Sequence, residues 1–188
     1  MVLASFITET GELRPGAPSC YTLGMQQVLD YIEANRARFV DDLCEYLRFP
    51  SISAQPEHKK DMQAAAKWFA GHCRSIGLKV EICKTPGQSI IVAKTPRKKG
   101  SGKPHYLVYG HYDVQPPDPL ELWNTAPFEP TIANGNVYAR GSTDNKGQHM
   151  AHINAVEAYL KTGTELPCDI TFIIEGEEEM GSGNLTPF

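Results

Sequence analysis

The stretch "CDITFIIEGEEEMGSG", residues 168–183, joins an apolar run to a cluster of glutamates and then to a Gly-Ser-Gly turn. The run 168–174 is short and almost continuously apolar, which predicts a strand buried on both faces. Four of the five residues at 175–179 are glutamates. Like charges this close repel one another unless a cation neutralises them, so the cluster calls for a physical explanation.

Helices and short strands alternate along the rest of the chain. Apolar spacing predicts three helices, at residues 25–48, 60–76 and 146–160. It also predicts three further strands, at residues 78–83, 89–94 and 105–110. Gly77 is suited to end the second helix, and Asn134-Gly135 predicts a tight hairpin turn. We therefore expect an α/β fold, a three-layer αβα sandwich around a mixed, largely parallel sheet.

Composition and charge restrict the class of protein. The 188 residues are 41% apolar and 21% charged, as in a globular domain, and the net charge of −4 gives no reason to expect nucleic acid or an anionic membrane as partner. The basic stretch 94–105 has no interleaved aromatic residue before its final histidine and is interpreted as a solvated loop. No apolar run is long enough to span a membrane.

The cysteines and the N-terminus predict the cellular environment. Five widely spaced cysteines without a C-x-x-C motif predict free thiols in a reducing cytoplasm. Residues 1–24 lack the basic start of a signal peptide, so we expect a poorly ordered extension there and a catalytic domain over 25–188.

Three segments with metal-binding side chains are expected at one edge of the sheet. His111-Tyr112-Asp113 follows the strand at 105–110, the glutamates follow the strand at 168–174, and Asp144 directly precedes a helix. Ligands of α/β sheets bind beyond the carboxyl ends of the strands. The sequence therefore predicts that these side chains are neighbours.

Each of these residues also has an ordinary structural interpretation. His111 and Asp113 leave the same face of an extended segment, so the acid can fix the histidine tautomer, although most histidines simply pack or face water. Asp144 can cap a helix or bridge two cations. Glu175 and Glu177 suit either a solvated acidic turn or a functional site.

Glu178 and Glu179 lie between a buried strand and a glycine-rich turn. One of them could ligate a metal while the other acts as general base on a water molecule. Together with the histidine, the acids predict a two-metal hydrolase site. The imidazole suits zinc, and the carboxylates suit zinc, manganese or cobalt.

Three motifs together resemble a known family: "YGHYDVQPP" at 109–117, "WNTAPFEPTIANGNVYARGSTDNKGQ" at 123–148 and "IIEGEEEMGSGN" at 173–184. They are similar to the di-zinc exopeptidases that include carnosine-type dipeptidases, carboxypeptidase G and the desuccinylase/deacetylase amidohydrolases. The resemblance covers about residues 25–185, and the intervals between the motifs fit the dipeptidase branch. It implies a zinc exopeptidase-like fold and two divalent metal ions, zinc first, with manganese or cobalt as alternatives.

The resemblance also implies roles for five residues: a metal ligand at His111, the acid that orients it at Asp113, an aspartate bridging two metals at Asp144, the catalytic general base at Glu178 and a metal ligand at Glu179. It further implies a cis peptide bond after Asp144. Two positions depart from the family pattern without removing a ligand: Ala139, where glycine is usual, and Asn145, where a second aspartate is frequent.

The family's remaining ligands and its lid domain are not found in these 188 residues. We therefore expect 25–188 to be the N-terminal part of an incomplete catalytic domain, weakly active or inactive alone, whose full-length form is a homodimer acting on small peptides. Two alternatives stay open at this point. The first is an N-acyl amino acid deacylase or desuccinylase, and the second is a non-catalytic remnant that binds a metal or a partner.

Overall fold

The computed structural model describes residues 20–97, 100 and 102–188, with side chains from Gly24 onward. The helices are α1 (Cys20–Ala34), α2 (Arg36–Leu47), α3 (Lys59–Ser75) and α4 (Lys146–Thr162), with short 3-10 turns η1 (Pro56–His58), η2 (Leu120–Leu122) and η3 (Glu178–Met180). Residues 1–19 of the predicted extension 1–24 lie outside the described residues. Its last five residues already belong to α1, so the helical part begins earlier than expected.

A four-stranded sheet has the order β1 (Lys79–Cys83), β2 (Ile90–Lys94), β6 (Asp169–Glu175), β3 (His105–His111). The sheet is mixed, as predicted, but "largely parallel" was wrong for the described strands, since only β3 and β6 run parallel. The short connection between β1 and β2 explains part of the difference. A connection of a few residues can join only antiparallel neighbours, because a parallel pair needs a long crossover.

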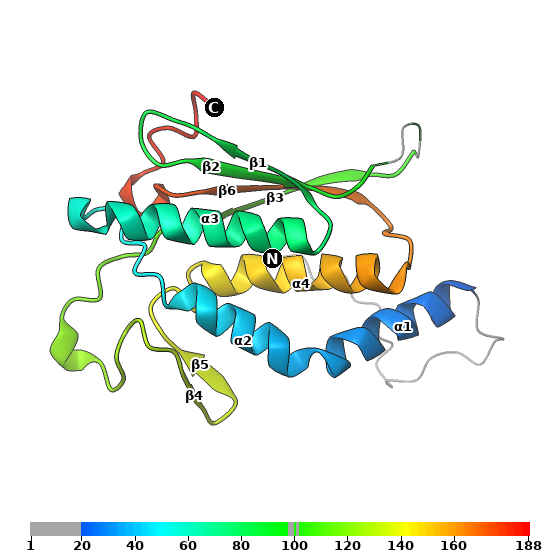
Figure 1. Ribbon diagram of the computed structural model, residues 1–188, viewed down its shortest axis with the longest axis horizontal. Coiled ribbons are helices and arrows are strands. Elements are labelled where there is room, and N and C mark those ends of the chain that lie inside the picture. The colour runs from blue at the N-terminus through cyan, green and yellow to red at the C-terminus, as the bar shows by residue number, and fades with distance from the viewer. Residues whose placement is uncertain (1–19, 98–99, 101) are drawn as a thin grey trace, which may run out of the picture.

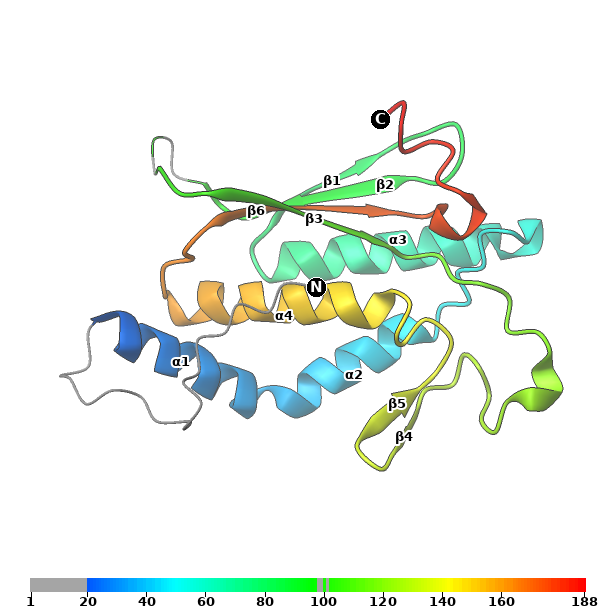
Figure 2. The same ribbon diagram turned by 180° about the vertical axis from the view of Figure 1, so that it is seen from behind.

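Helices cover one face of this sheet. Figures 1 and 2 show α3 and α4 against the sheet and α1 and α2 beyond them, packed on α4. The predicted third layer is therefore not formed by the described elements. The core lies between the sheet and the helices α3 and α4. The residues that are almost completely buried there include Phe69, Ile91, Met150, Ile153 and Phe172.

The predicted helix over 25–48 is interrupted at Asn35, which separates α1 from α2. Asn35 has φ −107° and ψ 8°, and its side-chain amide donates to the carbonyl of Tyr31 at 2.9 Å. An asparagine side chain competes with the helical hydrogen bonds in this way, which a pattern of apolar spacing does not reveal.

Other sequence predictions are confirmed. Gly77 follows α3 with φ 106°, and Asn134 and Gly135, both with positive φ, form the turn between β4 (Thr131–Ala133) and β5 (Asn136–Tyr138). The four cysteines whose side chains the structure describes, Cys44, Cys73, Cys83 and Cys168, are free thiols. No helix in that part of the chain is long and apolar enough to cross a bilayer.

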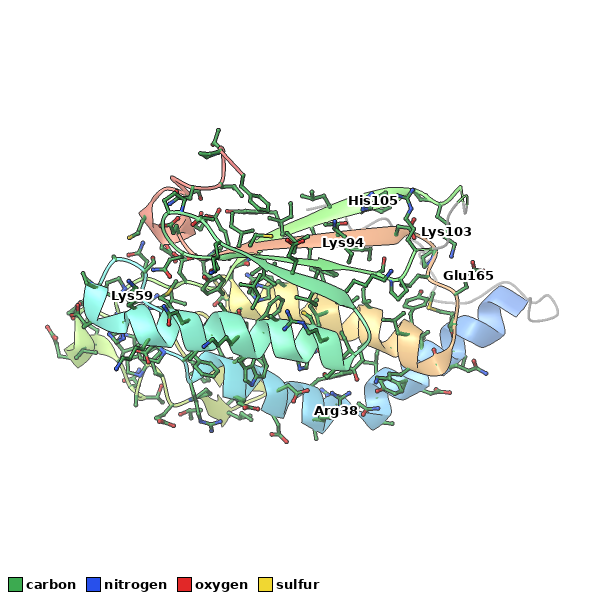
Figure 3. All side chains as sticks on the ribbon, turned by 45° about the horizontal axis from the view of Figure 1, so that its top comes forward. Arg38, Lys59, Lys94, Lys103, His105 and Glu165 are labelled. Atoms are coloured by element: carbon green, nitrogen blue, oxygen red, sulfur yellow. The ribbon has the colours of Figure 1, made fainter. Side chains whose placement is uncertain are left out.

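The basic stretch 94–105 connects β2 to β3 at the end of the sheet away from the glutamate-rich turn, and residues 98, 99 and 101 of it lie outside the described part. At its far end Lys103 pairs with Glu165 at 2.7 Å, and Figure 3 shows both residues near His105. This part of the loop thus packs against the protein itself.

A buried acid joins the outer helices to the core. Glu157 of α4 accepts hydrogen bonds from Arg38 Nη2 at 2.6 Å and from the Tyr31 hydroxyl at 2.9 Å. Arg38 lies on the outer helices in Figure 3. Since Tyr31 belongs to α1 and Arg38 to α2, one carboxylate fixes both helices on α4.

We expect Glu157→Gln to lower the free energy of unfolding by about 2 kcal/mol, because the buried site loses the charge that Arg38 pairs with. The control is Glu33→Gln, whose exposed carboxylate lies 3.9 Å from Arg36. That change should cost less than about 0.5 kcal/mol. Urea unfolding compares the two variants, and equal losses would contradict the role of Glu157.

Candidate metal centre

The parallel pairing of β3 with β6 brings the first two predicted segments together. His111 lies directly opposite Glu175 in the register, so the residues after both strands emerge at the same edge of the sheet. The helix α4 begins beside them, which places Asp144 at that edge too (Figure 2). All three segments that the sequence singled out are therefore neighbours.

Three of the five candidate residues converge on one place, and a fourth, Asp144, lies beside one of them, His111. Ligand atoms of His111, Glu178 and Glu179 all lie within 4.8 Å of one another. Asp144 Oδ1 lies 3.0 Å from His111 Nε2, and Glu178 Oε2 lies 3.9 Å from the same nitrogen. His111 is buried, whereas the side chains of Asp144 and Glu178 are 75% and 42% exposed, so the cluster opens to solvent on one side.

The fifth candidate, Asp113, lies behind the cluster and is completely buried. Its carboxylate accepts hydrogen bonds from the Ser53 hydroxyl at 2.6 Å and from the backbone N–H groups of Glu178 and Glu179 at 3.3 and 3.1 Å. His111 Nδ1 lies 3.4 Å from Oδ1 of the same carboxylate. One buried acid thus contacts both the histidine and the turn that carries the two glutamates.

The tautomer of His111 follows from its neighbours. Nδ1 lies 3.1 Å from the backbone carbonyl of Asp113, which can only accept, so Nδ1 carries a proton and Nε2 faces the acids. The backbone carbonyl oxygen of Asp113 lies closer to Nδ1 than the Asp113 carboxylate does, although the sequence predicted the carboxylate as the partner. Burial lowers the pKa of His111, but the hydrogen bonds and negative charge of Asp113 and the charge of Glu178 outweigh it and raise the pKa to about 9.

Glu175 and Glu177 do not form a solvated turn, because both are buried. Glu175 accepts hydrogen bonds from the Tyr109 hydroxyl at 2.5 Å and from Ser182 at 2.7 Å, and Glu177 accepts one from Asn184 at 2.7 Å. Burial and the bond to Glu175 raise the pKa of the Tyr109 phenol, which keeps it a donor. These two glutamates hold the turn together from within.

Several polar residues at the site were missed by sequence reasoning. Gln115 Nε2 donates to Glu179 Oε2 at 2.8 Å, which leaves the other carboxylate oxygen of Glu179 available. Asn145 Oδ1 accepts from the backbone N–H of His111 and from His149 Nδ1, both at 3.1 Å. Asn145 had attracted notice only as a departure from the family pattern, and nothing in the spacing marked Gln115 or His149.

A buried lysine supports the same region. Lys146 Nζ donates to the carbonyl oxygens of Tyr46 and Phe49 at 3.2 and 2.9 Å, at the end of α2 and in the loop that follows. Burial lowers the pKa of Lys146 to about 7, against the attraction of the Asp113 charge. The bond joins the N-terminus of α4 to the loop that carries Ser53.

The donor set fits a divalent cation. The imidazole of His111 and the carboxylates of Glu178 and Glu179 converge, and the Asp144 carboxylate lies 3.0 Å from the same imidazole. Within the described residues the Asp144 carboxylate has a hydrogen bond only with His111, and the Glu178 carboxylate has none. Imidazole and carboxylate together suit zinc, manganese or cobalt. The expected cis peptide bond between Asp144 and Asn145 is also present.

The fold is α/β, and this donor set makes it a candidate metal-binding protein. The sequence profile of peptidase family M20/M25/M40 matches residues 107–187. The human Beta-Ala-His dipeptidase is 35% identical over 171 residues, 84% of this chain and 33% of that protein. The Cys-Gly metallodipeptidase of Candida albicans is 31% identical over 173 residues, 85% of this chain and 36% of that protein.

A solved structure agrees with these sequence matches. The crystal structure of human carnosine dipeptidase 1 superimposes with a TM-score of 0.78 at 35% identity, covering 86% of this chain and 36% of that one. Residues 107–187 thus belong to peptidase family M20/M25/M40, and the relationship indicated by the motifs is confirmed. The chain spans about a third of the length of these relatives.

Close packing at Gly110 gives a test of the site's rigidity. A Cβ atom there would lie 2.6 Å from Asn145 Oδ1, the atom that accepts from His111. We expect Gly110→Ala to lower the free energy of unfolding by about 1–3 kcal/mol through overpacking. The control Gly71→Ala, on α3 with open space around it, should raise that free energy by about 0.5–1 kcal/mol. Thermal unfolding measures both, and an unchanged Gly110→Ala would contradict the expected close packing.

Proposed function

We propose that the whole protein hydrolyses the peptide bond of small peptides, dipeptides foremost, with the help of divalent metal ions. The observation that carries the proposal is the convergence of His111, Glu178 and Glu179 within 4.8 Å, with Asp144 3.0 Å from the histidine. The relatives named as dipeptidases support the same reaction. His111, Asp144 and Glu179 would hold the metal ions.

Each residue of the chain has a distinct task in this proposal. When bound, divalent cations acidify water and polarise a carbonyl group. Glu178 takes the proton of the attacking water at its carboxylate and returns it to the leaving amine. Glu178 suits this task because its side chain is partly exposed and accepts no hydrogen bond from Ser, Gln or Asn side chains of the described chain, whereas Gln115 occupies one oxygen of Glu179.

The finer features belong to the same proposal. We assign two metal ions, with Asp144 as the bridging ligand, because it approaches His111 from the side opposite Asp113 and is largely exposed. Zinc is the expected metal, since imidazole is among the donors. A homodimeric full-length form and a cytoplasmic location stay predictions.

The role of Glu178 is tested with the variant Glu178→Gln. Its activity is measured in the full-length protein, as the cells of origin make it. We expect kcat to fall about 100-fold or more, because the amide cannot accept a proton, with metal content unchanged. The matched control is Glu177→Gln on the same turn, whose carboxylate bonds to Asn184 and not to His111. It should retain most of the activity. Full activity in Glu178→Gln would contradict the assigned base.

Substrate class and metal dependence are tested together. The protein should hydrolyse dipeptides faster than N-acetyl or N-succinyl amino acids, and a chelator should abolish turnover that added Zn²⁺, Mn²⁺ or Co²⁺ restores. Initial rates on matched substrates give the comparison. Faster release of the acyl group would favour the deacylase alternative, and turnover that survives chelation would contradict the metal-dependent reaction.

A further inference from the structure

We infer that Ser53 is a positioning residue of this metal centre, acting through Asp113. The inference rests on the function proposed above. Asp113 is completely buried, and the shortest hydrogen bond to its carboxylate comes from the Ser53 hydroxyl at 2.6 Å. Ser53 lies 60 positions earlier in the chain, outside every motif that carries the metal donors.

The geometry of Asp113 explains why its orientation matters. Oδ2 accepts from Ser53 and from the N–H of Glu179, while Oδ1 accepts from the N–H of Glu178 and lies 3.4 Å from His111 Nδ1. Rotation of the carboxylate would break contacts to the histidine and to the turn at the same time. The Ser53 hydroxyl is therefore the one side-chain donor among the three that fix this carboxylate, which contacts His111 and the turn with Glu178 and Glu179.

Contacts with Val114, shortly after the end of β3, fix the position of the segment 51–53. The Val114 N–H donates to the Ser51 carbonyl at 2.9 Å, and Ile52 forms a parallel bridge with Val114. Lys146 Nζ donates to the carbonyl of Phe49, two residues before this segment. Because these contacts are made by backbone atoms and a buried lysine, they keep Ser53 in place without involving the metal donors.

Ser51 offers a matched control on the same loop. Its hydroxyl also donates a buried hydrogen bond of 2.6 Å, but to the backbone carbonyl of Tyr112, away from the Asp113 carboxylate. Loss of either hydroxyl removes one short buried bond from residues two positions apart. A purely structural role for Ser53 would make the two variants alike.

The experiment measures Co²⁺ binding to the intact protein by visible absorption, with unfolding temperature as a second readout. Ser53→Ala should raise the Co²⁺ dissociation constant about tenfold and shift the absorption bands, because removal of a ligand's supporting partner weakens binding by about 10–100-fold. Ser53→Thr keeps the hydroxyl and should restore binding. Ser53→Cys, close in size with a weaker donor, should be intermediate and serves if the alanine variant does not fold. Ser51→Ala should lose similar thermal stability with its dissociation constant changed less than about twofold.

The outcomes separate this inference from the proposed function. Equal Co²⁺ affinity in Ser53→Ala and Ser51→Ala, or wild-type affinity in Ser53→Ala, would overturn the positioning role even if the protein hydrolyses dipeptides. Weakened binding in Ser53→Ala alone, with Thr rescue, supports it even if no dipeptide is hydrolysed. In an active protein, Ser53→Ala should also lower kcat more than it changes KM, since the hydroxyl does not reach the open side of the site.

Discussion

The parallel register between β3 and β6 is the constraint on which the site depends. With His111 opposite Glu175, the residues that leave the two strands are delivered to one edge of the sheet. A shift of the register by one residue would turn every side chain of the shifted strand to the other face of the sheet. His111 and the turn after β6 would then no longer meet. The core packing of Phe172 and Ile174 against the helices specifies the same register, so folding and site assembly use one set of contacts.

Burying acids near this edge carries an electrostatic cost that the fold compensates locally. The Asp113 carboxylate receives three hydrogen-bond donors, and Glu175 and Glu177 receive hydroxyl and amide donors from Tyr109, Ser182 and Asn184. Such donors replace the hydrogen bonds to water that a buried carboxylate loses. The internal acids therefore brace the turn through these protein donors.

Much of the fold could be predicted from the sequence, because apolar spacing and turn residues report local structure. The strands, α3, α4 and the hairpin at Asn134 follow from such patterns. The break at Asn35 did not, because it depends on one side-chain hydrogen bond, and the sheet's strand directions depend on connections that periodicity does not encode. Likewise, His111, Asp144 and the glutamates carry recognisable chemistry. Ser53, Gln115 and His149 are common polar residues whose partners are brought near only by the tertiary fold.

The division of the acids by burial explains which of them suit a metal. A carboxylate whose two oxygens both accept from N–H and O–H donors gains little from a cation and is fixed in position, which describes Asp113. Asp144 and Glu178 lack such donors and face solvent on the open side of the site, where each keeps oxygens free for a cation or a proton. Since like charges are otherwise unfavourable at this spacing, the unsaturated acids give the cluster its affinity for positive charge. The saturated ones give it its geometry. A glutamate-rich turn at the end of a buried strand can thus serve two purposes, because neighbouring residues of one short segment face opposite environments.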